Sequence, residues 1–351
     1  METWKRTVYI SLVCVFCTAF GVSQLAPILP LYFHDLGVQT PEAMSLWSGL
    51  ATGATYIIVC LAAPFWGRVA DKKGRKITLI RSSFGMALCN VLIAFQTTPE
   101  GVVLIRLIQG LVSGFYSASI TLIASESPIE RTGWALGLLA SANLAGSLIG
   151  PLLGGYIADT VGIRNDFIIV GTLMGLAGVL ATIFIHENYV PQPNPEKLSI
   201  RKLKEQIPEF NSIVALCVAS FIYAICIMSL QPVISVYIKG IVPSDTENLA
   251  FIAGAVFSAM GIAQLMSSSP LGKLVDKIGP RKVLVVSLIY VGILNIPQAY
   301  VSDVYQLAII RFLQGFGLGG MLPALNTYLS SKTPREFTGQ VFSYNQSCLF
   351  F

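Results

Sequence analysis

One arginine, a few residues inside the end of an apolar stretch, is the residue of this sequence best placed to do chemistry. Arg106 lies there. A charged side chain inside a bilayer costs about 3 kcal/mol on insertion scales, so it marks a functional site unless it reaches the interface. Gln109, Gly110 and Ser113 follow Arg106 at helical spacing and predict a polar stripe that faces a cavity. This stripe could stabilise the charged form of a neighbouring acid or bind an anionic group of a substrate.

The acids are the next candidates, because proton transfer needs a titratable group. All eighteen Asp and Glu residues fall in predicted loops or at predicted helix ends. Asp35 follows the first apolar stretch and is the predicted proton carrier, although capping a solvated helix end is the commoner role of an acid in that place. The sequence shows no nucleophile–base set, no P-loop and no metal-binding cluster, so it predicts no enzyme, no metal site and no bound cofactor.

The elements that position these residues are predicted to be membrane helices. The 351 residues are 54% hydrophobic and 12% charged, whereas soluble proteins carry about 25% charged residues. The apolar stretches are about long enough to cross a ~30 Å hydrocarbon core as helices. We predict an all-α polytopic membrane protein with ten complete spans, at 7–33, 46–66, 77–95, 102–124, 133–157, 167–185, 213–237, 249–268, 283–300 and 307–329.

The distribution of lysine and arginine predicts the orientation of these spans. Of the 23 basic residues, nineteen fall on the side of the N-terminus and only two on the other side. Basic loops stay in the cytoplasm, so the N-terminus is predicted to be cytoplasmic. The net charge of +5 is then explained by topology, and no nucleic-acid partner is expected.

Polar positions recur at a fixed offset along the chain. The following pairs are each 205 residues apart: Gly67 and Gly272, Asp71 and Asp276, Arg106 and Arg311, Gln109 and Gln314. This offset predicts two parallel halves, at 1–185 and 213–351, joined by a cytoplasmic linker at 186–212. An eleventh span is expected to begin near Gly339 and to be cut off at Phe351, so the second half is expected to be truncated.

The densest charge of the chain lies between two apolar stretches, in GRVADKKGRK at 67–76. Its glycines, Gly67 and Gly74, permit a tight turn and a close helix approach, and Asp71 can pair with Arg75 or approach a helix N-terminus. Such a cluster can latch helix ends in one conformational state, whereas the lysines, Lys76 among them, are also explained as topology signals. The weaker copy GKLVDKIGPRK contributes Gly272, Asp276 and Arg281.

A glycine-rich stretch, GSLIGPLLGG, spans residues 146–155. Its glycines at GxxxG spacing permit close helix packing, and its proline removes one backbone hydrogen bond. The predicted result is a tight helix contact that seals one side against ion leak, although packing alone explains the pattern nearly as well. The residues concerned are Gly146, Gly150, Pro151, Gly154 and Gly155.

These segments resemble the sequence motifs of the major facilitator superfamily. GRVADKKGRK resembles its motif A, RLIQG at 106–110 its motif B, and GSLIGPLLGG its motif C, which marks proton-coupled drug exporters. HENYVPQP at 186–193 and FSYNQS at 342–347 resemble a narrower group of bacterial multidrug exporters. The resemblance covers the whole chain.

The resemblance implies a major facilitator fold of two parallel six-helix halves and proton-driven export of drug-like small molecules by alternating access. It implies a role in proton transfer for Arg106, a proton gradient in place of any cofactor, a monomer, and the bacterial cytoplasmic membrane. The cavity is expected to be lined by helices 1, 4, 7 and 10, with these polar or aromatic positions: Gln24, Tyr32, Ser113, Tyr116, Tyr223, Gln231 and Asn326. The alternatives are a metabolite or sugar importer or uniporter of the same fold, or a truncated transporter without activity.

Overall fold

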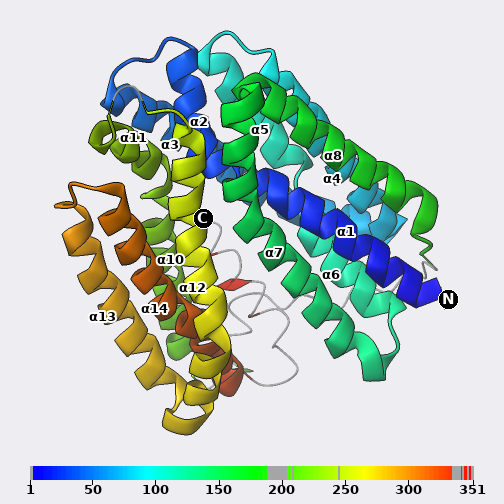
Figure 1. Cartoon of the computed structure of the whole chain (residues 1–351). Coiled ribbons are helices and arrows are strands. Elements are labelled where there is room, and N and C mark those ends of the chain that lie inside the picture. The colour runs from blue at the N-terminus through cyan, green and yellow to red at the C-terminus, as the bar shows by residue number, and fades with distance from the viewer. Residues whose placement is uncertain are drawn as a thin grey trace. The chain divides into compact units, whose positions relative to one another are not determined.

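Helices make up the regular structure of the described part of the chain (Figure 1). The computed structural model describes residues 3–187, 204, 206–207, 209–243, 246–333, 341, 344–345 and 348. In these residues nine helical spans are long and apolar enough to cross a membrane, and Phe210–Ile225 is a shorter apolar helix. The prediction of an all-α polytopic membrane protein is confirmed.

The helices follow one another with short connections. In chain order they are α1 (Thr3–Ser23), α2 (Leu25–Asp35), α3 (Pro41–Lys73), α4 (Arg75–Ala94), α5 (Pro99–Val112), α6 (Phe115–Glu126), α7 (Ile129–Val161), α8 (Ile163–Phe184), α10 (Phe210–Met228), α11 (Gln231–Ile241), α12 (Leu249–Ile278), α13 (Pro280–Gln298) and α14 (Val304–Lys332).

Helix starts follow from local sequence. Thr40 and Thr98 precede a proline at the first helical position and accept hydrogen bonds from Ala43 N and Gly101 N, respectively. A threonine cap followed by proline is a strong helix start, because proline needs no hydrogen-bond partner there. Three other helix pairs are joined by a single glycine with positive φ, namely Gly74, Gly162 and Gly279.

Three of the predicted continuous spans are interrupted, which corrects the prediction. The span 7–33 breaks at Gln24, the span 102–124 at Ser113–Gly114, and the span 213–237 at Ser229–Leu230. The second break has a clear local cause, because Gly114 adopts a φ of 113° in the left-handed region. An apolar run indicates membrane insertion but does not show where the backbone leaves the helix.

Side chains from neighbouring helices donate hydrogen bonds to the free carbonyl groups at the break between α5 and α6. The Trp66 indole donates to the Leu111 carbonyl at 2.7 Å, and Arg81 donates to the Leu111 and Ser113 carbonyls at 3.2 and 2.8 Å. The Arg81 guanidinium also lies 3.5 Å from the centre of the Trp66 ring. These contacts bond carbonyls at the helix end, as an interrupted helix in an apolar environment requires.

The chain divides into two compact units. Unit 1 comprises residues 1–193, 231–239 and 244–254, and unit 2 comprises residues 194–230, 240–243 and 255–351. The predicted halves at 1–185 and 213–351 stay a prediction. Most of the predicted linker and most of the predicted eleventh span lie outside the described residues.

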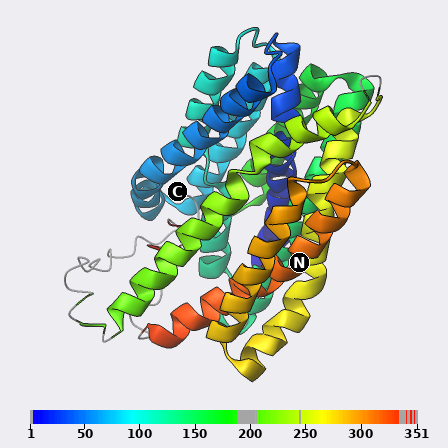
Figure 2. The same cartoon turned by 90° about the vertical axis from the view of Figure 1, so that its left-hand side faces the viewer.

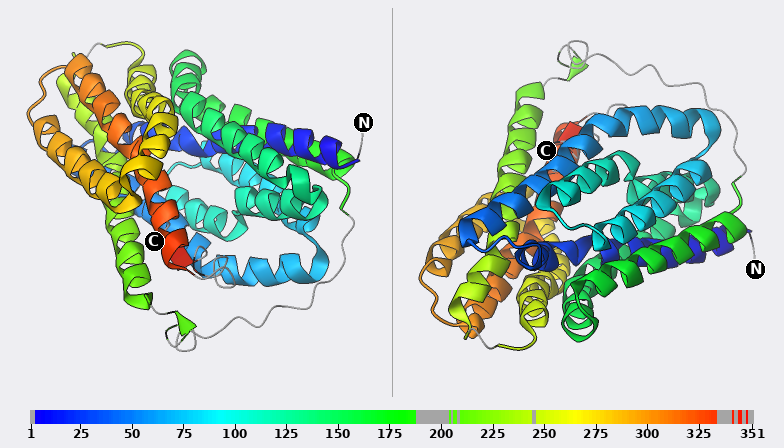
Figure 3. Two further views of the ribbon diagram at one scale, coloured as in Figure 1. Left: turned by 90° about the horizontal axis from the view of Figure 1, so that it is seen from below. Right: turned by 90° about the horizontal axis from the view of Figure 1, so that it is seen from above.

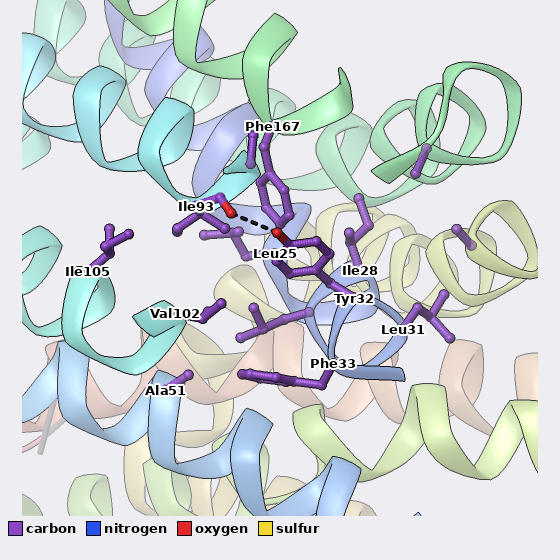
Figure 4. Packing of buried hydrophobic residues seen from close by; sticks show 14 of the residues in the cluster. Leu25, Ile28, Leu31, Tyr32, Phe33, Ala51, Ile93, Val102, Ile105 and Phe167 are labelled. Carbon is purple, nitrogen blue, oxygen red and sulfur yellow. Dashed lines mark hydrogen bonds between the residues drawn. The ribbon is translucent and has the colours of Figure 1, made fainter. Parts of the chain in front are cut away.

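In unit 1, α1 packs along α7 and α8, and α4 packs along α8. Figure 3 shows α1 in blue beside α8 in green in both of its views. The core at one end of this bundle surrounds Tyr32, whose ring meets the Phe167 ring edge-on with 5.1 Å between the centroids. The Tyr32 hydroxyl donates to the Ile93 carbonyl at 2.7 Å, so α2, α4 and α8 meet at this point (Figure 4).

In unit 2, α13 and α14 lie side by side, as the orange ribbons of Figure 2 show. Helix α10 packs against α14 through an apolar cluster that includes Ile213, Leu216 and Leu325. Two polar contacts support α10. The buried Ser220 hydroxyl donates to Asn345 at 2.7 Å, and Lys332 lies 2.7 Å from both carboxylate oxygens of Glu209.

Candidate functional site

Two motif C glycines hold α7 directly against α1. A Cβ atom on Gly146 would lie 2.5 Å from the Phe16 carbonyl oxygen, and one on Gly150 would lie 2.5 Å from that of Phe20. The Ser23 hydroxyl donates to the Gly146 carbonyl at 3.3 Å. No side chain fits into contacts this short, so the glycine spacing sets the distance between the two backbones.

The third glycine of this series, Gly154, leaves room for the side chain of Gln24. A Cβ atom on Gly154 would overlap the Gln24 amide oxygen and lie 2.6 Å from Gln24 Cβ. Gln24 stands at the break between α1 and α2 and is fully buried. Its Nε2 donates to Oδ2 of Asp166 at 3.0 Å. The close approach of α7 therefore positions an amide beside a carboxyl group.

Asp166 is fully buried in the first turn of α8. Asp166 lies just outside the predicted span 167–185, whereas α8 begins at Ile163. A signal was present: Asp159 and Gly162 repeat the spacing of Asp71 and Gly74, and this spacing places a helix start directly after the glycine. Inside the membrane region, a buried acid is a functional candidate.

Arg106 is buried on α5, and its Nη1 donates to Oε1 of Gln109 at 2.7 Å. The Thr55 hydroxyl donates to the Arg106 carbonyl at 3.0 Å, and Gly110 lies against the Thr55 carbonyl. Within the described residues, no carboxylate lies within ion-pair distance of Arg106, and its Nε has no hydrogen-bond partner. Arg106 and Gln109 of RLIQG are therefore joined on one helix, whereas the cavity that the stripe was expected to face stays a prediction, and the neighbouring acid that it could serve is not among the described groups.

Helices α12 and α14 repeat this arrangement with different chemistry. Arg311 is buried on α14, and its Nη1 lies 3.4 Å from the Met260 sulfur, while Gln314 donates to Asn295 at 2.9 Å. Gly315 lies against the Met260 carbonyl, as Gly110 lies against that of Thr55. Met260 follows Thr55 at the repeat offset, so one helix crossing occurs twice in the molecule.

Motif A forms the turn between α3 and α4, where Gly74 has φ 92° and ψ 160°. Glu187 lies at this turn and accepts hydrogen bonds from the backbone N–H groups of Arg75 and Lys76, both at 2.8 Å. This carboxylate faces the N-terminus of α4, where the helix dipole favours negative charge. Glu187 belongs to the segment HENYVPQP, whose sequence does not indicate this role.

Other motif A predictions have mixed outcomes. The Asp71 side chain lies outside the described part, so its pairing with Arg75 is undecided. A Cβ atom on Gly67 or Gly272 would meet no described atom within 4 Å, so the expected close approach at Gly67 is not found there. In the second copy, Gly279 has φ 91° and forms the same turn, whereas Asp276 and Arg281 are exposed.

The end of α7 binds the first turn of α12, within unit 1. Asp159 accepts from Ala250 N at 3.1 Å and from Phe251 N at 2.7 Å, one bond to each carboxylate oxygen. Gly155 lies against the Ala250 backbone, and Gly254 lies against the Pro151 carbonyl. Motif C therefore continues from the α1 contact into a contact with α12, with a carboxylate capping the helix at its end.

The predicted cavity residues fall into different environments. Gln24 and Tyr32 are fully buried, with Tyr32 in the core of unit 1. Five positions retain some exposure: Ser113 and Tyr116 beside the α5–α6 break, Gln231 at the start of α11, Tyr223 on α10, and Asn326 on α14. Asp35, the predicted proton carrier, lies exposed at the end of α2, with His34 3.8 Å away.

A cluster of three metal-binding side chains is not present in the described ranges.

A profile of the family described as Major Facilitator Superfamily matches residues 11–241 and 216–351. The Multidrug resistance protein MdtG of Salmonella dublin is 38% identical over 344 residues, which are 98% of this chain and 85% of that protein. The protein of the same name from Dickeya zeae is 39% identical over 344 residues, covering 98% of this chain and 84% of the relative.

Solved structures of low sequence identity share the fold. The nucleoside transporter NupG superposes with a TM-score of 0.78 at 13% identity, over 99% of this chain and 88% of that chain. An inward-facing, unoccupied bacterial homologue of the human lysosomal transporter Spinster gives a TM-score of 0.77 at 14% identity, over 100% and 80%. The human organic anion transporter MFSD10 gives 0.69 at 15% identity, over 100% and 91%.

Proposed function

This chain belongs to the major facilitator superfamily and is a transporter rather than an enzyme, and from that premise we propose that it exports drug-like small molecules in exchange for protons. One observation carries the proposal: the multidrug resistance proteins align with 98% of this chain at 38% and 39% identity. The proton gradient is the proposed energy source, with no cofactor and a monomer as the working unit.

The interrupted spans support a transport site near the middle of the membrane. In transporters with internal repeats, discontinuous helices form substrate and ion sites because their broken ends expose backbone groups. The breaks at Gln24, at Ser113–Gly114 and at Ser229–Leu230 fall in the first, fourth and seventh spans. Tyr116 and Gln231, directly after two of these breaks, are the aromatic and polar groups that we propose to contact substrate.

The membrane orientation is also a proposal. The bias of lysine and arginine supports a cytoplasmic N-terminus in the bacterial cytoplasmic membrane. The turn at Gly74 then faces the cytoplasm, and the Asp159 cap on α12 faces the outside. Reporter enzymes that are active only outside the cytoplasm, fused after Val161 and after Phe184, test this orientation. Activity is expected only for the fusion after Val161.

The function is tested by dye efflux from cells that lack their own drug pumps. The 351-residue chain is expected to lower the accumulation of fluorescent drugs, and an uncoupler of the proton gradient is expected to abolish the difference. R106A is expected to lose efflux while still reaching the membrane, because a buried arginine is costly to keep unless it functions. The control is R131Q, since Arg131 is exposed.

Two results would overturn this proposal. Export that persists in the presence of the uncoupler would remove the proton gradient as the energy source. Uptake of a metabolite or sugar without any drug efflux would identify the protein as an importer or uniporter of the same fold.

A further inference from the structure

We propose that Asp166, positioned by Gln24, is the proton-binding site that couples the gradient to export. This inference rests on the proposed function and assigns it a proton carrier. Both side chains are fully buried, and they are joined by the 3.0 Å hydrogen bond from Gln24 Nε2 to Asp166 Oδ2. The site replaces Asp35, which lies exposed at a helix end.

Two oxygen atoms of the pair indicate that the Asp166 carboxyl group is protonated. Asp166 Oδ1 and Gln24 Oε1 are both buried, and neither has a hydrogen-bond partner among the described groups. Both are acceptors when the carboxyl group is ionised, so neither can serve the other. One proton on Oδ1 turns that atom into a donor and leaves Oδ2 free to accept from the amide. The geometry is therefore that of a carboxylic acid beside an amide.

The charges around the site also favour a neutral carboxyl group at Asp166. Titratable groups on the surrounding helices include Tyr32, His34 and Asp35 on α2, Cys89 on α4, Arg106 on α5, Asp159 on α7 and Arg164 on α8 itself. Tyr32 donates to Ile93, Asp159 caps α12, and Arg164 donates to the Gln96 carbonyl. Among the described residues, only Gln24 forms a hydrogen bond with the Asp166 side chain. No cation among them offsets the free energy of burying a negative charge there.

The backbone around the pair links the state of the site to helix movement. Gln24 interrupts the first span, and Gly154 of motif C provides the space for its side chain. Gln24 follows α1 and Asp166 lies on α8, so a movement of α1 relative to α8 would move the amide away from the carboxyl group. When the site then meets water, the O–H bond of Asp166 breaks, its electron pair stays on Oδ1, and the proton passes to water. Rebinding a proton restores the paired state.

A sodium ion is the competing ligand for these two buried oxygen atoms without hydrogen-bond partners. Hard cations of this kind collect about six oxygen ligands, whereas this pair offers two. We therefore assign the site to a proton, and the test includes sodium as a separate arm.

The first test needs no transported drug. Infrared spectra of the purified protein at neutral pH are expected to contain the carbonyl band of a protonated carboxylic acid. The band is expected to disappear in D166N, to shift in Q24L, and to persist in D303N, whose side chain makes no cap bond. A band that survives in D166N, or that is lost only in D35N, would overturn the assignment, as would a band that sodium removes at constant pH.

The second test measures coupling. In vesicles, drug addition is expected to release protons from the wild type but not from D166N, whereas D166E is expected to release protons with a changed pH profile. A Q24L protein that behaves like the wild type in both tests would remove the positioning role of Gln24. If the infrared band is assigned to Asp166 but no drug moves protons, the site stands and the proposed function fails.

Discussion

The carboxylate of Glu187 binds the first two backbone N–H groups of α4, each at 2.8 Å. These amides have no partner within the helix, so the side chain serves as a cap supplied from another part of the chain. Gly74 makes the contact possible in two ways. It adopts a positive φ, and a Cβ atom in its place would lie 2.7 Å from a Glu187 carboxylate oxygen.

Replacing Glu187 by alanine is expected to lower stability by about 1 kcal/mol, the usual cost of losing a helix cap. E187Q is expected to lose less, because the amide retains one acceptor oxygen but no charge to favour the helix dipole. Thermal unfolding in detergent measures the effect. The control is E247Q, since Glu247 is exposed. Equal stability of E187A and the control would show that the cap contributes nothing.

The hydrogen-bond partner of a side chain was predictable from sequence where both residues lie on one helix at helical spacing. It was not predictable where the partner lies on another helix. Arg106 and Gln109 are three residues apart on α5, and their predicted stripe forms a 2.7 Å hydrogen bond. The partners of Asp166 and Arg75 lie 142 and 112 residues away in the chain. No period of a helix relates such positions, because tertiary packing alone brings them together.

At the scale of elements, Asp159 joins the end of α7 to the start of α12. We expect D159N to loosen this junction, because an amide offers one acceptor oxygen where two backbone N–H groups need one each. The measurement is the reactivity of a cysteine at Ala250 toward a membrane-impermeant thiol reagent, in a background without other cysteines. Ala250 is buried, so reactivity is expected to rise in D159N.

The matched control for this junction is D303N. Asp303 precedes α14 as a cap residue, but its side chain makes no cap bond. Unchanged reactivity at position 250 in D159N, or an equal rise in D303N, would show that the capping contact does not hold the two helices.

A second link between elements joins α10 and α14 in unit 2. The pKa of Glu209 lies below its ordinary value, because Lys332 donates a hydrogen bond to its carboxylate. A carboxyl group with a lowered pKa in the folded state stabilises that state above its unfolded pKa of about 4.3, and the stabilisation is lost as pH falls through the lowered value. E209Q is therefore expected to melt below the wild type at neutral pH, and the difference is expected to vanish in acid.

The approximate positions of the spans were predictable, because apolar length and the absence of charge determine insertion. Nine of the ten predicted spans are long and apolar enough in the described residues, and the exception is 213–237, where the apolar helix Phe210–Ile225 is shorter. The breaks were not predictable. Gln24 and Ser113 sit in apolar runs that satisfy every length criterion, and the groups that contact these breaks, Gly154 on α7 and the Arg81 side chain on α4, come from distant parts of the chain. Helix ends beyond the apolar runs were also missed, since α3 continues to Lys73 and α12 to Ile278 through charged residues.

At the scale of the whole molecule, the offset of 205 residues relates helix contacts as well as sequence. Gly110 and Gly315 occupy equivalent places, and each lies against a backbone carbonyl, that of Thr55 or that of Met260. The turns at Gly74 and Gly279 have the same backbone conformation. The side chains beside the two crossings differ, since Arg106 donates to Gln109 while Arg311 points to the Met260 sulfur. The backbone packing is therefore shared by the two crossings, whereas the polar contacts beside them differ.

This repeat predicts paired effects of paired substitutions. G110A and G315A each place a methyl group against a backbone carbonyl that cannot move without shifting its helix. Overpacking of this kind costs about 1–3 kcal/mol, so both variants are expected to unfold at lower temperature by similar amounts. The controls are G53A and G292A, because a Cβ atom at either position meets no described atom within 4 Å. If only one of the two variants unfolds at a lower temperature, the two crossings are not packed equally tightly. The 205-residue offset would then relate the sequences but not the stability of the two helix contacts.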